Sequence, residues 1–242
     1  MPYPKSPIRE AIFDIRFMDV SFNSVDDFDL IHEHIKNIFT ERKEKFRASG
    51  SIDVGAPKAQ LGNFQNEKVG FVYQNKSQTM HLQVYKHGLT LNVLKPYKSW
   101  EEHFPIFMQC LELFYELFTP KSVVRLGLRY INRVKIPMPL DSFQKYILNV
   151  PPIPDPLPKV FNNFFMQIST PCDEKGDMNA TIIQTIEPVT DGKLPFIIDI
   201  DLFQTQVENK PSEISVVLEN MRKMKNEVFE SLITEETRNL FK

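Results

Sequence analysis

The sequence predicts an α+β fold: a curved antiparallel sheet made of two similar β-α-β-β-β-α halves, with long helices on one face. Several short segments alternate apolar and polar residues with a period of two, which is typical of half-buried strands. Two longer segments, 99–118 and 212–232, place apolar residues at helical spacing. The order of elements also recurs at an offset of 115 residues, which takes Asp26 to Asp141 and Phe114 to Phe229. Chance similarity between amphipathic elements is the alternative explanation of that offset.

The first half, 1–120, is expected to begin with a strand over 8–17. Ser24-Val-Asp-Asp27 is typical of a capping box, in which a serine and a later acid bind the free amides at a helix start. A helix should follow, then strands over 69–74, 79–86 and 89–94 with a hairpin turn at 86–88. Ser99-Trp-Glu-Glu102 is a second capping box, and its helix should end near Phe118, before Pro120.

The second half, 121–242, is expected to repeat this order within the same single domain, 1–242. A long strand over 123–136 should lead to a short helix near Asp141 and a proline-rich connector over 150–158. Strands are expected at about 163–169, 179–187 and 196–204. The last helix should run from Pro211-Ser212, with the serine as its cap, to about Leu232.

Composition indicates an ordinary globular protein. Hydrophobic residues make up 42% of the chain and charged residues 25%, and the formal net charge is −2. That charge gives no overall attraction to nucleic acid or to an anionic membrane. The two cysteines, Cys110 and Cys172, are typical of reduced thiols, and no apolar run is long enough for a membrane span. With no signal peptide recognised, we expect a cytoplasmic protein without a membrane partner.

The most informative stretch is 122–137, where cationic residues alternate with apolar ones. Arg125, Arg129 and Arg133 should share one face, with Gly127 giving clearance between two arginines, and Val124 should lie on the apolar face. The same polar face should receive acids and one more arginine from the neighbouring strands. These residues are Glu10, Asp14 and Arg16 from the first strand, and Asp199 and Asp201 from 196–204.

Three interpretations of this face are open. It could be a lattice of ion pairs, because buried charges require partners. It could be a ligand site in which Arg125, Arg129 and Arg133 contact an anionic group and Asp14, Asp199 and Asp201 hold those arginines in place, with Arg16 and Glu10 also in the site. It could hold Mg²⁺ or Mn²⁺ on Asp199 and Asp201, with arginines binding phosphate. Nucleic acid is disfavoured because four acids balance four bases, so the face has no excess of cations.

Four segments together resemble a sporadically distributed prokaryotic family of uncharacterised proteins of roughly 250 residues. They are Pro7-Ile-Arg-Glu-Ala-Ile-Phe-Asp-Ile-Arg16, Arg125-Leu-Gly-Leu-Arg-Tyr-Ile-Asn-Arg133, Ile198-Asp-Ile-Asp201 and Phe229-Glu-Ser-Leu-Ile-Thr234. The resemblance implies a soluble bacterial or archaeal protein and carries over no catalytic residues. It also implies a histidine early in the last helix, where this chain has Leu218-Glu-Asn-Met-Arg-Lys.

The sequence therefore predicts a ligand-binding or protein-interaction module that uses the charged sheet face, with no cofactor. The partner would be an anionic small molecule or another protein, and a homo-oligomer is compatible with the sequence. The alternative is a metal-dependent phosphohydrolase that acts on a phosphorylated small molecule with Mg²⁺ or Mn²⁺. Whether the chain is an enzyme is left open.

Overall fold

The computed structural model describes residues 3–49, 52–53, 60–61, 65–157, 161–174 and 176–242. Within these ranges the fold is mixed helix and sheet, which confirms the α+β class. The elements of the first half are β1 (Ile8–Met18), the 3-10 helix η1 (Val25–Ile31), α1 (His32–Ile35), β2 (Glu41–Ser49), β3 (Ile52–Asp53), β4 (Gln60–Leu61), β5 (Gln65–Gln74), β6 (Met80–Tyr85), β7 (Gly88–Leu94) and α2 (Trp100–Phe118). Those of the second half are β8 (Ser122–Pro137), the 3-10 helix η2 (Phe143–Lys145), β9 (Phe165–Pro171), β10 (Met178–Ile186), β11 (Lys193–Gln204), α3 (Pro211–Leu232) and α4 (Glu235–Asn239).

One antiparallel sheet organises the described part of the chain. Its nine strands lie in the order β2-β5-β6-β7-β1-β8-β11-β10-β9, and β3 pairs separately with β4. The two strands expected to open the halves, β1 and β8, lie side by side in the middle, where Ala11 faces Tyr130 and Phe13 faces Leu128. Each is flanked on its other side by the last strand of its own half, β7 or β11.

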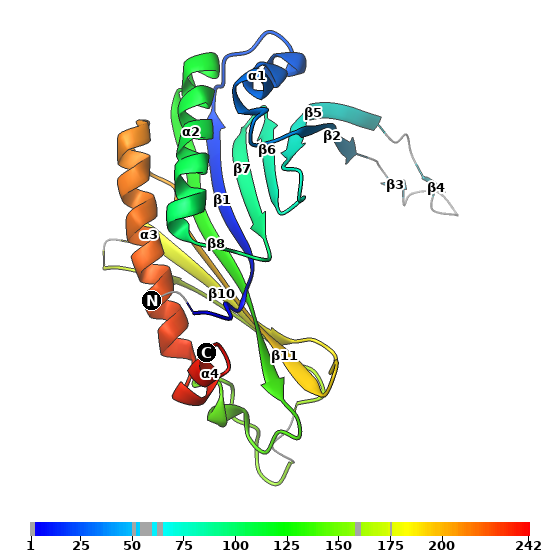
Figure 1. The fold of residues 1–242 in the computed structure, drawn as a ribbon, viewed down its shortest axis with the longest axis vertical. Coiled ribbons are helices and arrows are strands. Elements are labelled where there is room, and N and C mark those ends of the chain that lie inside the picture. Colours follow the sequence, from blue (N-terminus) through cyan, green and yellow to red (C-terminus); the bar gives the residue numbers. More distant parts are fainter. Residues whose placement is uncertain (1–2, 50–51, 54–59, 62–64, 158–160, 175) are drawn as a thin grey trace.

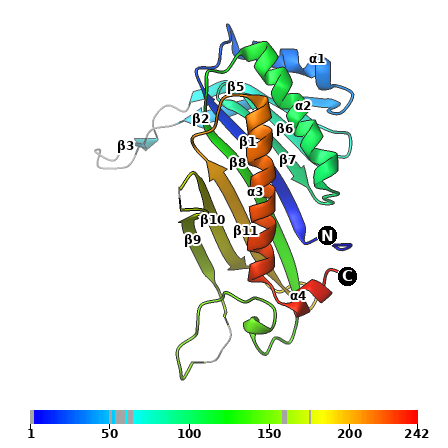
Figure 2. The ribbon, with the colours of Figure 1, turned by 90° about the vertical axis from the view of Figure 1, so that its left-hand side faces the viewer.

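Both long helices cover the same face of the sheet (Figure 1; Figure 2). α2 packs its phenylalanines on β1, with ring centroids 5.2 Å apart for Phe13 and Phe107 and 5.3 Å apart for Phe17 and Phe114. α3 lies beside it over β8 and β11. Burial of apolar area at about 25 cal/mol per Å² makes this layer the main stabilising contribution. No helix in the described ranges is both long and apolar enough to cross a bilayer.

Local sequence signals explain the helix starts. Ser24 and Asp27 form the expected capping box, but the segment they open is a 3-10 turn followed by one turn of α-helix. Ser99 caps α2 by accepting a hydrogen bond from the Glu102 amide. The expected cap of α3 is wrong, because Pro211 takes the first helical position and Lys210 is therefore the N-cap. Lys210 makes no side-chain cap bond, since an ammonium group cannot accept a hydrogen bond from a backbone amide.

Two further expectations differ from the structure. β2 was not predicted, because its sequence Glu-Arg-Lys-Glu-Lys-Phe-Arg has no apolar face, and it forms an edge of the sheet. The placement of Val124 on the buried face is also wrong. The β1–β8 pairing shifts between Arg16 and Phe17, so Val123 is buried and Val124 is exposed.

Candidate functional site

The arginines of β8 lie on the sheet face that the long helices leave uncovered, together with the predicted acids. Asp199 faces Ile131 across the strands and Asp201 faces Arg129, while Ile198 and Ile200 are buried on the helix side. The sequence pattern therefore placed the charges of β8 and β11 on the correct face. Asp14, on the neighbouring β1, reaches the same cluster.

Each of these arginines is engaged by carboxylates. Arg129 donates from Nε and Nη2 to the two oxygens of Asp199, at 2.8 and 2.5 Å. Arg125 donates from Nη1 to Asp14 at 2.7 Å and from Nη2 to both oxygens of Asp201 at 2.9 Å. The two parallel hydrogen bonds between Arg129 and Asp199 form a bidentate pair, which is strong and geometrically specific. The face therefore resembles a structural lattice more than an open anion site.

The remaining predicted residues of this face are placed at its margin. Arg16 approaches Asp14 with its Nε at 3.2 Å and keeps half of its side chain exposed. Glu10 accepts a 2.7 Å hydrogen bond from Asn92. Arg133 donates to Glu187 at 2.7 Å, and Arg9 shares the same carboxylate at 2.9 Å. The sequence analysis did not identify Glu187 as a partner, although it is the last residue of the strand predicted over 179–187, because that strand shows no alternation of charged residues.

The pKa shifts show pairing and burial acting together on this face. Hydrogen bonding to Asp199 raises the pKa of Arg129, which fixes its positive charge. Burial raises the pKa of the Asp201 carboxyl above its ordinary value, although Arg125 acts in the opposite direction. In the described ranges no group of three or more histidine, cysteine, aspartate or glutamate side chains is arranged to hold a metal ion. The geometry thus gives no support to a metal site on Asp199 and Asp201, whose oxygens already accept from guanidinium groups.

A second site, a cavity of about 900 Å³, lies where β1 begins and the chain before it leaves the sheet. The segment before β1 crosses to the helices: the amide of Lys5 donates to the Phe241 carbonyl at 2.9 Å, and Tyr3 donates to Glu230 at 2.6 Å. The amide of Arg133 closes the other side by donating to the Pro7 carbonyl at 2.8 Å. We call this space the basic cavity.

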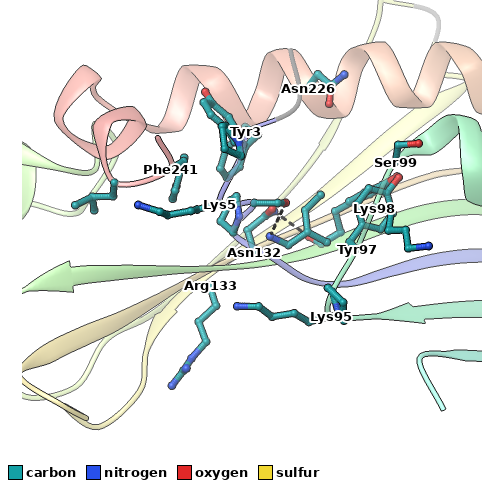
Figure 3. Close-up of a pocket in the computed structure, with 18 of the residues that line it drawn as sticks. Tyr3, Lys5, Lys95, Tyr97, Lys98, Ser99, Asn132, Arg133, Asn226 and Phe241 are labelled. Atoms are coloured by element: carbon teal, nitrogen blue, oxygen red, sulfur yellow. Dashed lines mark hydrogen bonds between the residues drawn. The ribbon is translucent and has the colours of Figure 1, made fainter. Parts of the chain in front are cut away.

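Cationic side chains outnumber acidic ones in the lining of the basic cavity, where the acids are Glu101 and Glu230. Three of the cations are neutralised: Arg222 by Glu101 at 2.6 Å, Arg133 by Glu187 at 2.7 Å and Lys98 by Glu102 at 2.9 Å. Five lysines that line it have no carboxylate partner among the described residues; they are Lys5, Lys95, Lys135, Lys193 and Lys225. Figure 3 shows Lys5, Lys95 and Arg133 gathered around the segment that leads into β1. An uncompensated positive potential is therefore concentrated here, although the chain as a whole carries −2.

Lys225 is the deepest of these cations. It is only 9% exposed, and its Nζ lies 3.9 Å from the centre of the Tyr130 ring. Burial, followed by the charge of Arg222, lowers its pKa from 10.5 to about 8, and Glu230 opposes this shift. An ammonium group removed from water without an anion is costly, so proteins seldom bury one without a partner.

Aromatic side chains form the inner wall of the cavity. The hydroxyl groups of Tyr97 and Tyr130 lie 3.0 Å apart. Trp100 has Phe104 stacked at 4.5 Å and Arg222 at 5.1 Å, and its indole nitrogen donates to Glu219 at 2.7 Å. Tyr97 also has aromatic neighbours, His103 at 5.1 Å and Tyr130 at 5.7 Å, but it is only half buried and lines the cavity, so part of its surface faces the space where a ligand would lie.

Sequence reasoning missed this cavity, except for Arg133 at its edge. A signal was present in α3, where Lys225 is four residues from both Met221 and Phe229 and so lies on the buried stripe. A scan against protein-family models and a search of curated proteins found no match to this chain.

Proposed function

We propose that this protein binds an anionic small molecule in the basic cavity. The observation that carries the proposal is Lys225, an ammonium group nine-tenths buried at a cavity wall that forms no ion pair with a carboxylate among the described residues. Four exposed lysines around the same cavity add charge that an anion would neutralise. Lysine is a common phosphate binder that acts as a point charge.

The charged sheet face has a different role in this proposal. Its arginines are satisfied internally by Asp14, Asp199 and Asp201, so it stabilises the sheet instead of receiving the ligand. Only Arg133 belongs to both regions, because it pairs with Glu187 and also lines the basic cavity. The anionic partner expected from the sequence is thus kept, while its site moves from Arg125 and Arg129 to the cavity edge.

Other expectations stay proposals. A duplication of residues 1–120 and 121–242 is supported by the strand order, which places β7-β1 beside β8-β11 with the two opening strands at the centre. The resemblance to a sporadic prokaryotic family and a cytoplasmic location fit this picture. Of the two functions predicted from the sequence, we favour a binding module over a metal-dependent phosphohydrolase, since the described residues offer no metal-ligand cluster.

The test is a calorimetric titration with inorganic tripolyphosphate, a probe that carries phosphate charge and nothing else. Wild-type protein should bind one equivalent, more weakly as salt rises because salt screens the exposed lysines. Lys225→Met removes one positive charge from the cavity and keeps the exposed lysines, so its affinity for tripolyphosphate should fall severalfold. The matched control is Lys223→Met, two residues away on the exposed side of the same helix, and it should bind like wild type. Absence of any heat with wild type would refute the proposal.

A further inference from the structure

The basic cavity is divided into two chemically different parts. Its outer part carries Lys5, Lys95, Lys135 and Lys193, all exposed and without carboxylate partners in the described residues. Its inner part is formed by Tyr97 and Tyr130, with the buried Lys225 against the Tyr130 ring. In Figure 3, Lys95 and Arg133 lie on one side of the strands, whereas Tyr3 and Asn226 lie toward α3.

A second, smaller recess extends the outer part toward the uncovered sheet face. It is lined by Pro7, Lys95, Arg133 and Lys135, which also line the basic cavity, and by Arg9 and Glu187. The two spaces therefore share a wall. The shared wall is cationic, which makes it suited to a chain of several negative charges.

Hydration decides which end of a ligand enters which part. A polyphosphate group is strongly hydrated, and one buried ammonium cannot compensate for the loss of that water. Several exposed lysines can bind the group while water still reaches it, so the phosphates belong in the outer part. The inner part suits a planar ring, because Tyr97 offers a half-buried aromatic surface and Lys225 offers one donor to a ring nitrogen or oxygen.

We infer that the ligand is a nucleoside polyphosphate, with its base against Tyr97 and Lys225 and its phosphates on Lys5, Lys95 and Lys135. This inference rests on the proposed anion-binding function and specifies the class of ligand that the cavity binds. A cavity of about 900 Å³ is within the size range of small-molecule sites. Base stacking on aromatic side chains is tolerant of base identity, so the proposal specifies a nucleoside polyphosphate and not which base it carries.

The experiment compares three probes by calorimetry: adenosine triphosphate, inorganic tripolyphosphate and adenosine. Wild-type protein should bind the nucleotide at least tenfold more tightly than tripolyphosphate, and adenosine more weakly than either. Tyr97→Leu should remove the preference for the nucleotide while tripolyphosphate binding is kept. The Lys95→Ala/Lys135→Ala variant should weaken both phosphate probes and flatten their salt dependence, and Lys76→Ala, an exposed lysine in the β5–β6 turn, should change nothing.

Each outcome has one meaning. Equal affinity for the nucleotide and tripolyphosphate would overturn the nucleoside assignment and leave anion binding intact. No binding of either phosphate probe would overturn both proposals. A nucleotide preference that survives Tyr97→Leu, in a variant whose melting curve shows that it is folded, would overturn the placement of the base.

Discussion

The ammonium group of Lys225 lies 3.9 Å from the centre of the Tyr130 ring, and no carboxylate among the described residues pairs with it. A cation over an aromatic face gains roughly 0.5 to 2 kcal/mol, which offsets only part of the cost of burying the charge. This relationship links the stability of the fold to its proposed function. A residue that is unfavourable for the empty protein is favourable when an anion occupies the cavity.

Replacing Lys225 by methionine should therefore stabilise the ligand-free protein. The change keeps the length of the side chain, removes the buried charge and loses the contact with Tyr130. We expect a net gain of about 1 to 2 kcal/mol at pH 7, measured by urea unfolding. Lys223→Met should change stability by less than about 0.5 kcal/mol, as is usual for an exposed site. A destabilised Lys225→Met protein would show that the lysine is structural.

The same residue predicts how stability depends on pH. In the folded protein its pKa is about 8, and in the unfolded chain it has the ordinary value of 10.5. Between these values the unfolded chain holds a proton that the folded protein has released, so the free energy of unfolding rises with pH. The gain is on the order of 3 kcal/mol across this window. The stability advantage of Lys225→Met should accordingly shrink between pH 7.5 and pH 10, and an advantage that stays constant would contradict the assigned shift.

Arg129→Ala tests the role of the charged sheet face. The substitution leaves the Asp199 carboxylate, which is 7% exposed, without its bidentate partner. We expect a loss of about 1 to 3 kcal/mol in the free energy of unfolding and unchanged binding of tripolyphosphate. Arg16→Ala is the matched control, since Arg16 is half exposed and Asp14 retains Arg125; its loss should stay below about 1 kcal/mol. Weakened tripolyphosphate binding in Arg129→Ala would return the ligand site to this face.

Gly127→Ala should disrupt the ion pairs that Arg125 makes on the charged sheet face. A Cβ atom at Gly127 would lie 2.2 Å from Nη1 of Arg125, so the guanidinium would have to leave Asp14 and Asp201. We expect a loss of about 1 to 3 kcal/mol in urea unfolding. In an Arg125→Ala background the same substitution should cost much less, because the clash is gone. Equal costs in both backgrounds would mean that Gly127 acts through the backbone alone.

The sequence predicted the charged face well because strand periodicity decides it. Alternation placed Arg125, Arg129, Asp199 and Asp201 on one face, and the role of Gly127 as clearance follows from its place between two arginines. The local signal failed at Val124, because a register shift depends on the partner strand. It also failed for β2, whose charges alternate with no apolar face to indicate a strand.

The cavity could not be predicted because its residues come from distant segments. Lys5, Lys95, Lys135 and Lys225 meet only when the chain before β1 leaves the sheet and crosses to α3 and α4. None of these lysines belongs to a motif with fixed spacing. Only Lys225 was marked locally, as a charge on the apolar stripe of a helix, and such a position can equally hold a lysine whose head reaches water.

Crystals soaked in tungstate, a phosphate-like oxyanion with strong anomalous scattering, test the central claim most directly. The account predicts an anomalous peak in the basic cavity, within hydrogen-bonding distance of Lys225 or of the outer lysines Lys5, Lys95 and Lys135. A cavity without a peak, with tungstate bound only to Arg125 or Arg129 on the sheet face, would contradict it.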